Sequence, residues 1–329
     1  MILTKTQTES VTRGALRVTR DAEGGLHFHR FSEKQEGFLE PIRNFRPKIY
    51  CSAGVRFDFY TDSDYIGLSY SALERCTSRD VTLDVYEDGA LVFAHDVISK
   101  KEGVTTFRAE FEKKGRKRVT VYLPHNFELV LRSLELSDGA LAEPYTAYTK
   151  KVLMCGDSIT QGHHTEFASL SYANRLAAFF DWDMLNQSVA GYWFDGAWVD
   201  GNIDFAPELI TAAFGTNDWA GECRGEDFEK NVRGFFDSLT SAFPNVPTAV
   251  ILPVWRVNHD MDSFCAFEEL GEKIARVAEE FKDVRVIDAY KFIPHLREFF
   301  ADDGVHPNSL GHAEYARGVE DAFMGLKNI

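Results

Sequence analysis

One serine of the chain stands where a buried strand is expected to end. Residues 151–155 form a short, mainly apolar run, and Gly156, Asp157 and Ser158 follow it directly. Such a run before a glycine turn and a helical pattern predicts a buried strand that opens an α/β unit. Because ligands bind at the carboxyl ends of the strands in open α/β sheets, Ser158 is a candidate nucleophile. The alternative is a serine that only caps a helix.

A serine hydroxyl becomes a good nucleophile only when a neighbouring base removes its proton, and histidine is the first candidate for that base. His306 lies near the C-terminus, three residues after Asp303. A single tight loop would let this carboxylate bind the second imidazole nitrogen, as in a Ser-His-Asp system. Asp302 competes for the same role, and the spacing favours Asp303. Before Pro307, His306 could instead be only a helix-entry residue.

Attack on an ester carbonyl also requires hydrogen-bond donors aimed at the developing oxyanion. Gly191 closes a segment that follows the second expected strand, and it can present its N–H without an interfering side chain. Asn217 follows the third expected strand and offers a side-chain amide. The backbone N–H of Ser158 is the third candidate donor. The alternatives are a plain turn glycine at 191 and a loop-capping asparagine at 217.

The C-terminal part of the chain has an alternating pattern of apolar runs and helix-like segments, which would position these residues. Mainly apolar runs recur, each followed by a helix-like segment, at 151–155, 184–189, 209–215, 248–254 and 284–288. Strands that alternate with helices predict a parallel sheet covered on both faces. Residues 263–281 mark one apolar helical face at Phe267, Leu270, Ile274 and Val277. We therefore expect an α/β domain over residues 146–329.

Residues 1–145 predict an all-β domain. Val55, Phe57 and Phe59 alternate with polar residues, which predicts a strand with one buried and one solvated face. Asp88-Gly89 is a strong hairpin signal between two further strand patterns. Several short strands with turns between them predict a β-sandwich or jelly roll, and we see no helical stripe among them.

Composition restricts the class of protein. The 329 residues suggest two domains, at ~100–200 residues per domain, and 44% hydrophobic with 26% charged residues is ordinary for a soluble globular chain. The net charge of −15 argues against a nucleic-acid partner. No apolar stretch is long enough to cross a membrane or to serve as a secretory signal. The five cysteines are odd in number and lack paired spacing, so we expect reduced thiols and a cytoplasmic location.

Four segments together resemble the sequence blocks of the SGNH-hydrolase (GDSL-type esterase/acylhydrolase) family. They are Gly156-Asp-Ser-Ile-Thr160, Gly191, Gly215-Thr-Asn-Asp218 and Asp303-Gly-Val-His-Pro307, in family order. The resemblance covers residues 150–325 and implies a flavodoxin-like, three-layer α/β/α domain. Residues 1–145 are also similar to the β-sandwich that precedes the catalytic domain in some bacterial members, including carbohydrate-esterase-like ones.

By that resemblance Ser158 is the nucleophile, His306 the base and Asp303 its orienting acid. The Ser158 N–H, Gly191 and Asn217 would form the oxyanion hole. The implied activity is a serine esterase that works through an acyl-enzyme without a cofactor. Our hypothesis for the substrate is a small-molecule ester, with a short acyl group such as acetyl on a carbohydrate or similar polyol. The alternatives are an acyltransferase with the same triad and a catalytically silent carbohydrate-binding protein; a homo-oligomer is possible.

Further residues near the expected strand ends are candidates for binding substrate. Trp193, Trp219 and Trp255 could stack on a sugar or acyl chain, although an aromatic residue is more often part of the core. Arg256 could hold an anionic group or form a surface salt bridge. Asp157 is a weaker candidate, since it could simply bond the loop backbone.

Two adjacent histidines, His163 and His164, follow the nucleophile segment. Adjacent side chains point apart, and we see no carboxylate–histidine set that would complete a metal site with them. We therefore expect no metal ion and place these histidines at the rim of the substrate site.

Overall fold

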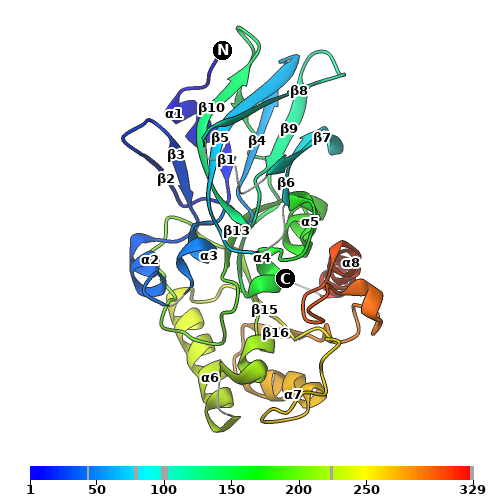
Figure 1. Cartoon of the computed structure of the whole chain (residues 1–329). Helices are drawn as coiled ribbons and strands as arrows, with labels where there is room; N and C mark the ends of the chain where they lie inside the picture. The colour runs from blue at the N-terminus through cyan, green and yellow to red at the C-terminus, as the bar shows by residue number, and fades with distance from the viewer. Residues whose placement is uncertain (43, 78–80, 98–102, 223–224, 327–329) are drawn as a thin grey trace.

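Two antiparallel sheets and one parallel sheet make up the computed structural model (Figure 1). The structure describes residues 1–42, 44–77, 81–97, 103–222 and 225–326. Of the five cysteines, Cys223 lies outside these residues, and the other four are free thiols. Among the described residues, no helix is long and apolar enough to cross a bilayer.

The parallel sheet contains the five strands that the apolar runs predict. Its strands are β12 (Lys150–Gly156), β13 (Trp182–Ser188), β14 (Leu209–Ala213), β15 (Thr248–Ile251) and β16 (Val284–Ile287). They lie in the order β13-β12-β14-β15-β16. This order is that of flavodoxin-like doubly wound sheets, so the predicted fold class is confirmed.

Helices cover both faces of this sheet and make three layers. Helices α5 (Tyr172–Phe179) and α8 (Ser309–Gly325) pack on the face that buries Val152 and Met154. Helices α6 (Gly225–Ala242) and α7 (Phe267–Ala278) pack on the opposite face. The alternation follows from the two-residue period of a strand, which sends successive side chains to opposite faces.

The two antiparallel sheets lie above the parallel sheet in Figure 1 and share one core. One sheet has the order β1 (Thr12–Arg13), β4 (Arg56–Thr61), β9 (Lys117–Tyr122), β6 (Val81–Glu87), β7 (Ala90–Val97), with β11 (Glu143–Pro144) also beside β4. The other has the order β2 (Arg17–Arg20), β3 (Leu26–His29), β10 (Phe127–Leu136), β5 (Tyr65–Arg75), β8 (Thr105–Glu110). Strands β6 and β7 form the predicted hairpin. Asp88 and Gly89 both have positive φ, as a type I′ turn requires.

The polar face of β4 is buried, which corrects the expectation of a solvated face. Arg56 and Asp58 are at most 3% exposed. Arg56 Nη2 donates to the carbonyl oxygen of Trp182 at 2.7 Å, at the start of β13. Asp58 accepts two bonds of 2.8 Å from the Arg118 guanidinium. Charges can be buried here because they are paired and hydrogen-bonded where the antiparallel sheet meets the α/β part.

The all-β prediction for residues 1–145 is wrong in three places. Helices α1 (Lys5–Val11), α2 (Glu33–Leu39) and α3 (Arg46–Tyr50) interrupt the strands. They are too short to produce a helical stripe in the sequence. Capping boxes at Thr4/Gln7 and Ser32/Gln35 begin the first two, and the spacing Ser/Thr-x-x-Gln was the available signal.

The segment around α2 and α3 packs with the α/β part. Phe31, Leu39 and Ile49 belong to the same hydrophobic cluster as α6 and α7. Arg30 is fully buried, and its guanidinium donates to the carbonyl oxygens of Ser188 (3.1 Å) and Lys48 (2.7 Å). The division at residues 145 and 146 stays a prediction, and this earlier segment contributes to the core on the α6 and α7 side of the parallel sheet.

We predict that Phe31→Ala lowers the free energy of unfolding by about 3–5 kcal/mol, because it empties a fully buried site in that core. Urea unfolding followed by tryptophan fluorescence measures the change. Phe38→Ala is the matched control, since Phe38 lies seven residues later, on helix α2, and is 39% exposed; it should change the value by less than about 0.5 kcal/mol. Equal losses in the two variants would contradict the packing described here.

Candidate active site

Ser158 begins helix α4 (Ser158–Gln161) immediately after β12, the strand that lies between β13 and β14. Asp157 caps this helix, and its Oδ1 accepts the N–H of Ile159 at 3.0 Å. Gly162 ends the helix in the left-handed conformation, with φ of 101°. The short helix therefore places the hydroxyl at the carboxyl edge of the sheet, between the ends of β13 and β14.

The hydroxyl of Ser158 meets the imidazole of His306. The Oγ–Nε2 distance is 2.7 Å, and the other ring nitrogen, Nδ1, lies 2.7 Å from Asp303 Oδ2. Asp303 Oδ1 accepts the backbone N–H groups of Val305 (2.8 Å) and His306 (3.0 Å). The Asp303 carboxylate thus also holds the backbone of the loop that carries both residues. It is Asp303, rather than Asp302, that contacts the ring.

The Asp303 carboxyl is held in its charged form. Burial opposes ionisation, but the contacts with His164 and His306 and the backbone N–H of His306 outweigh it and hold the pKa well below its usual range. An ionised carboxylate at Nδ1 fixes the hydrogen of His306 on that nitrogen, which leaves Nε2 to accept a proton from Ser158. Chemically, the arrangement can activate a hydroxyl for attack on a carbonyl carbon.

The carboxylate also contacts a second histidine, which corrects our reading of the adjacent pair. His164 Nε2 lies 3.1 Å from Asp303 Oδ2. The ligand atoms of His164, Asp303 and His306 are within 4.8 Å of one another, so a carboxylate–histidine set does exist. The bond between Asp303 and His306 accounts for most of this convergence, and we assign no metal to it. His163, in contrast, is buried.

Both predicted oxyanion segments reach the same edge of the sheet as Ser158. In the strand register Gly156 pairs with Ser188 on one side and with Ala213 on the other. Gly191 has φ of 80°, a conformation that favours glycine. The N–H groups of Ala190 and Tyr192 are bonded to Gln161 Oε1 (2.7 Å) and Val189 O (3.0 Å). Among the described residues, no acceptor is bonded to the N–H of Gly191.

Asn217 follows β14, and its Nδ2 donates one hydrogen to Tyr192 O at 2.8 Å. This bond ties the asparagine segment to the glycine segment. It fixes the amide plane and leaves the second N–H of the same group as a donor. The carboxyl edge therefore holds a hydroxyl, an imidazole and amide donors on neighbouring loops.

Most of the predicted substrate residues lie in the interior. Trp219 is 1% exposed, and its Nε1 donates to Cys265 O at 2.8 Å. Trp255 is buried and stacks on His295, and Arg256 is buried with its guanidinium on Thr216 Oγ1 at 3.1 Å. Asp157 is buried as the cap of α4. Only Trp193 is half-buried, with its ring stacked on Tyr192 at 4.9 Å between centroids.

Two further residues of the site were not predicted from the sequence. Lys48 of α3 brings its Nζ to 3.2 Å from the position that a β-carbon on Gly191 would take. Gln161 bonds both the Ala190 N–H and Cys51 Sγ (2.7 Å). Lys48 reaches the site through tertiary packing alone, whereas Gln161 directly follows the nucleophile segment, on helix α4.

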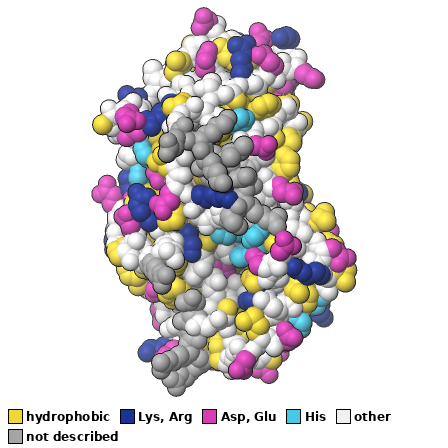
Figure 2. Space-filling model, in the orientation of Figure 1, with side chains coloured by type: hydrophobic (Ala, Val, Ile, Leu, Met, Phe, Trp, Pro, Cys, Tyr) yellow, Lys and Arg dark blue, Asp and Glu magenta, His cyan; other side chains and the backbone are white. Residues whose placement is uncertain are grey.

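On the molecular surface, histidine side chains gather near the middle of one face, below the antiparallel sheets, with acidic and basic side chains beside them (Figure 2).

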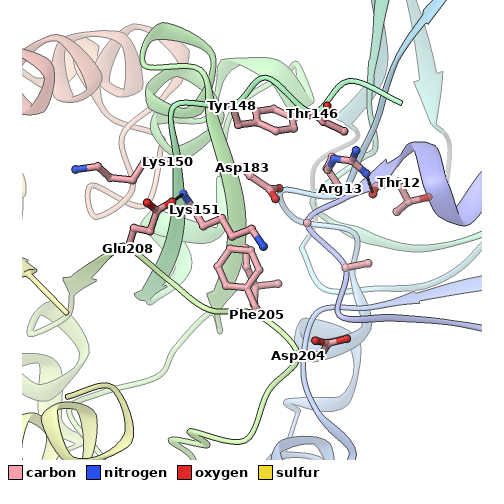
Figure 3. A pocket seen from close by; sticks show the side chains of 13 residues that line it. Thr12, Arg13, Thr146, Tyr148, Lys150, Lys151, Asp183, Asp204, Phe205 and Glu208 are labelled. Carbon is pink, nitrogen blue, oxygen red and sulfur yellow. Dashed lines mark hydrogen bonds between the residues drawn. The ribbon is translucent and has the colours of Figure 1, made fainter. Parts of the chain in front are cut away.

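A cavity of about 440 Å³ lies elsewhere, at the amino ends of the parallel strands. Figure 3 shows Arg13 and Asp183 directed into it from its two walls. Arg13 Nη2 is bonded to Tyr145 O at 2.7 Å and Tyr148 to Asp58 at 2.6 Å. Much of this polar lining serves to join the sheets.

Residues 154–314 match the family model described as the GDSL-like lipase/acylhydrolase family. All four sequence blocks lie within the matched residues, so the resemblance found in the sequence extends over this domain. The match supports an enzyme of the ester-hydrolase class. A comparison with curated proteins gave no significant match.

Solved structures share the fold over nearly the whole chain. A salicylyl-acyltransferase, SsfX3, from a tetracycline biosynthetic pathway is 22% identical with a TM-score of 0.83, and the match covers 96% of this chain and 94% of that one. A putative GDSL-like lipase from Bacteroides ovatus is 19% identical, with a TM-score of 0.74 and coverage of 97% and 96%. A family two carbohydrate esterase from Clostridium thermocellum, in complex with cellohexaose, is 14% identical, with a TM-score of 0.66 and coverage of 92% and 98%.

A buried carboxyl beside the site should leave a pH signature in stability. Asp218 is fully buried, and burial raises its pKa to about 7. Between the usual carboxyl pKa and 7 the native state holds a proton that the unfolded state releases, so this group makes the protein less stable as pH rises. Asn at this position cannot ionise and can still accept the Phe194 N–H.

We predict that the free energy of unfolding of the wild type, relative to Asp218→Asn, falls as pH rises from 5 to 8. Each unit of pKa displacement corresponds to about 1.4 kcal/mol. Urea unfolding at several pH values measures the difference. Asp321→Asn, at a site 62% exposed, is the control and should give a nearly flat difference. A flat difference for Asp218→Asn would show that its carboxyl is not perturbed.

Proposed function

We propose that the chain is a serine esterase that cleaves carboxylic esters through an acyl-enzyme. The observation that carries this proposal is the continuous set of short contacts from Ser158 through His306 to Asp303. Each group is of the type that the chemistry needs, and each lies within hydrogen-bond distance of the next.

In the first half-reaction His306 Nε2 removes the proton from Ser158 Oγ, which attacks the carbonyl carbon of the ester. The resulting oxyanion is stabilised by the N–H groups of Ser158 and Gly191 and by the free hydrogen of the Asn217 amide. Asp303 stabilises the imidazolium that forms. The bond between the carbonyl carbon and the alcohol oxygen then breaks, and His306 gives its proton to the departing alcohol.

In the second half-reaction water takes the place of the alcohol. His306 removes a proton from water, and the hydroxide attacks the acyl-serine carbonyl in the same oxyanion hole. Collapse of this second tetrahedral species returns the proton to Ser158 and releases the carboxylic acid. No group outside the protein and its substrate is needed for the proton balance.

For the substrate we favour a short acyl group, such as acetyl, on a carbohydrate or similar polyol. Two observations support this choice. The fold resembles that of a carbohydrate esterase solved with cellohexaose, over 92% of this chain. The half-buried Trp193 ring follows the Gly191 segment directly, and an aromatic face there suits a sugar ring.

We predict that a fluorophosphonate probe labels the native protein once, and that Ser158→Ala abolishes both the labelling and ester cleavage. The reason is that the probe reacts only with an activated hydroxyl. Intact-protein mass spectrometry measures the adduct. Ser309→Ala, a serine at the start of α8, is the control and should still label. Labelling of Ser158→Ala would assign the nucleophile elsewhere.

We predict that Asn217→Ala lowers kcat by about 10²–10³ with a smaller change in KM, because an oxyanion donor acts mainly in the transition state. Steady-state hydrolysis of a nitrophenyl ester measures both constants. Asn202→Ala, on an exposed loop, should leave both unchanged. A raised KM with unchanged kcat would show that Asn217 only binds substrate.

A panel of esters tests the substrate. Acetylated sugars and nitrophenyl acetate should be cleaved faster than long-chain nitrophenyl esters. Adding an alcohol acceptor to the same assays separates hydrolysis from acyl transfer, since a transferase would form new ester in preference to free acid. Fast long-chain cleavage with inert acetyl sugars would overturn the proposed substrate but leave the esterase chemistry intact.

A further inference from the structure

The Asp303 carboxylate is approached by more groups than a Ser-His-Asp triad requires. Its Oδ1 accepts two backbone N–H groups, and its Oδ2 accepts His306 Nδ1. His164 Nε2 lies 3.1 Å from that same Oδ2. An ionised carboxylate has about four lone-pair sites, so His164 supplies a partner for the last of them. His164 approaches the carboxylate from the loop that follows the nucleophile.

The backbone at His164 is held in an uncommon conformation. His164 has φ of 69°, in the left-handed region that few residues other than glycine adopt. Gly162, two residues earlier, is also left-handed, and His163 N–H bonds back to Ser158 O at 3.0 Å. The chain thus folds back on the nucleophile helix before it presents the His164 ring. Such conformations persist where the surrounding structure fixes them.

The ring of His164 also supports His306 directly. The two imidazoles are stacked, with centroids 4.9 Å apart and planes at 29°. The His164 side chain is only 16% exposed. Its Nδ1 is buried, and no hydrogen-bond partner for it is found among the described residues. The hydrogen of the ring therefore belongs on Nε2, the nitrogen that faces Asp303, because protonated Nδ1 would be buried without an acceptor.

The other groups around this pair are largely neutral. Burial lowers the pKa of His125 to about 3 and holds that of His163 well below its usual range. Lys48 and Arg256 supply the nearby positive charges, which act on His163 and Asp303 respectively. The contact of His164 with Asp303, at 3.1 Å, is therefore made with an acid that is held in its charged form.

We propose that His164 is a positioning residue of the triad, which holds the Asp303 carboxylate through Nε2 and the His306 ring by stacking. This inference rests on the proposed function, since it assigns to His164 an effect on the reactivity of Ser158. The support links the nucleophile loop directly to the loop that carries the acid and the base. Without it, Asp303 Oδ2 keeps only one partner and the His306 ring loses a packed neighbour on one face.

The test compares two variants of similar size. Gln at 164 keeps an N–H near the position of Nε2, whereas Leu cannot donate. We expect His164→Leu to react with the fluorophosphonate probe about 10- to 100-fold more slowly than the wild type, as loss of a hydrogen bond to a charged group implies. His164→Gln should recover most of the rate. His295→Leu, an exposed histidine, is the control and should react at the wild-type rate.

A second readout does not depend on activity. The proton of His306 Nδ1 should give a low-field NMR resonance, which His306→Gln removes. We expect the resonance to be displaced or broadened in His164→Leu and to lie near its wild-type position in His164→Gln. Thermal unfolding of each variant confirms that it is folded.

The outcomes separate the two ideas. A wild-type protein that the probe does not label would overturn the proposed function, and the NMR comparison would still decide the role of His164. If His164→Leu keeps the wild-type rate and resonance, or if Leu and Gln lose the rate equally, the positioning role is wrong. A loss in Leu that Gln restores, seen in both readouts, supports it.

Discussion

The register of three parallel strands is the constraint on which the site depends. Gly156 lies level with Ser188 and with Ala213, so β12 and both of its neighbours end at the same height. The loops that follow must therefore begin side by side, and they carry Ser158, Gly191 and Asn217. The fourth loop, with Asp303 and His306, comes from beyond β16 and meets Ser158 at 2.7 Å. A slip of one strand would separate the hydroxyl from its amide donors.

The pKa values of the aspartate carboxyls near the site depend on burial and on the contacts that oppose it. For Asp157 and Asp218 burial has few opposing contacts and raises the pKa of each to about 7. For Asp303 two imidazoles and backbone N–H groups reverse the effect. The aspartate carboxyls at this edge of the sheet therefore differ in their tendency to ionise. The negative charge is kept beside the His306 imidazole.

The sequence was a good guide wherever a signal is local. The five apolar runs gave the parallel strands because each is short, buried and bounded by turns. The nucleophile, glycine, asparagine and aspartate–histidine segments were recognisable because each keeps its spacing within a few residues. The short contact between Asp303 and His306 follows from such spacing, since one loop holds both.

Contacts between distant segments could not be read in this way. Arg56 and Asp58 look like the solvated face of a strand, but the partners that bury them, Arg118 and Trp182, are far away in the chain. Trp219 stands after a strand end and resembles a binding platform, yet its neighbours enclose it. His164 is adjacent to His163, and only the left-handed turn sends one ring to the acid while the other is buried.

The burial of Phe31 and Leu39 in the α/β core has a consequence for synthesis. The ribosome makes Phe31 and Leu39 early, whereas α6 and α7, against which they pack, emerge only after most of the chain has been translated. Until then these apolar side chains lack the part of their core that α6 and α7 supply. Phe31 and Leu39 are therefore open to aggregation during synthesis until α6 and α7 have been made.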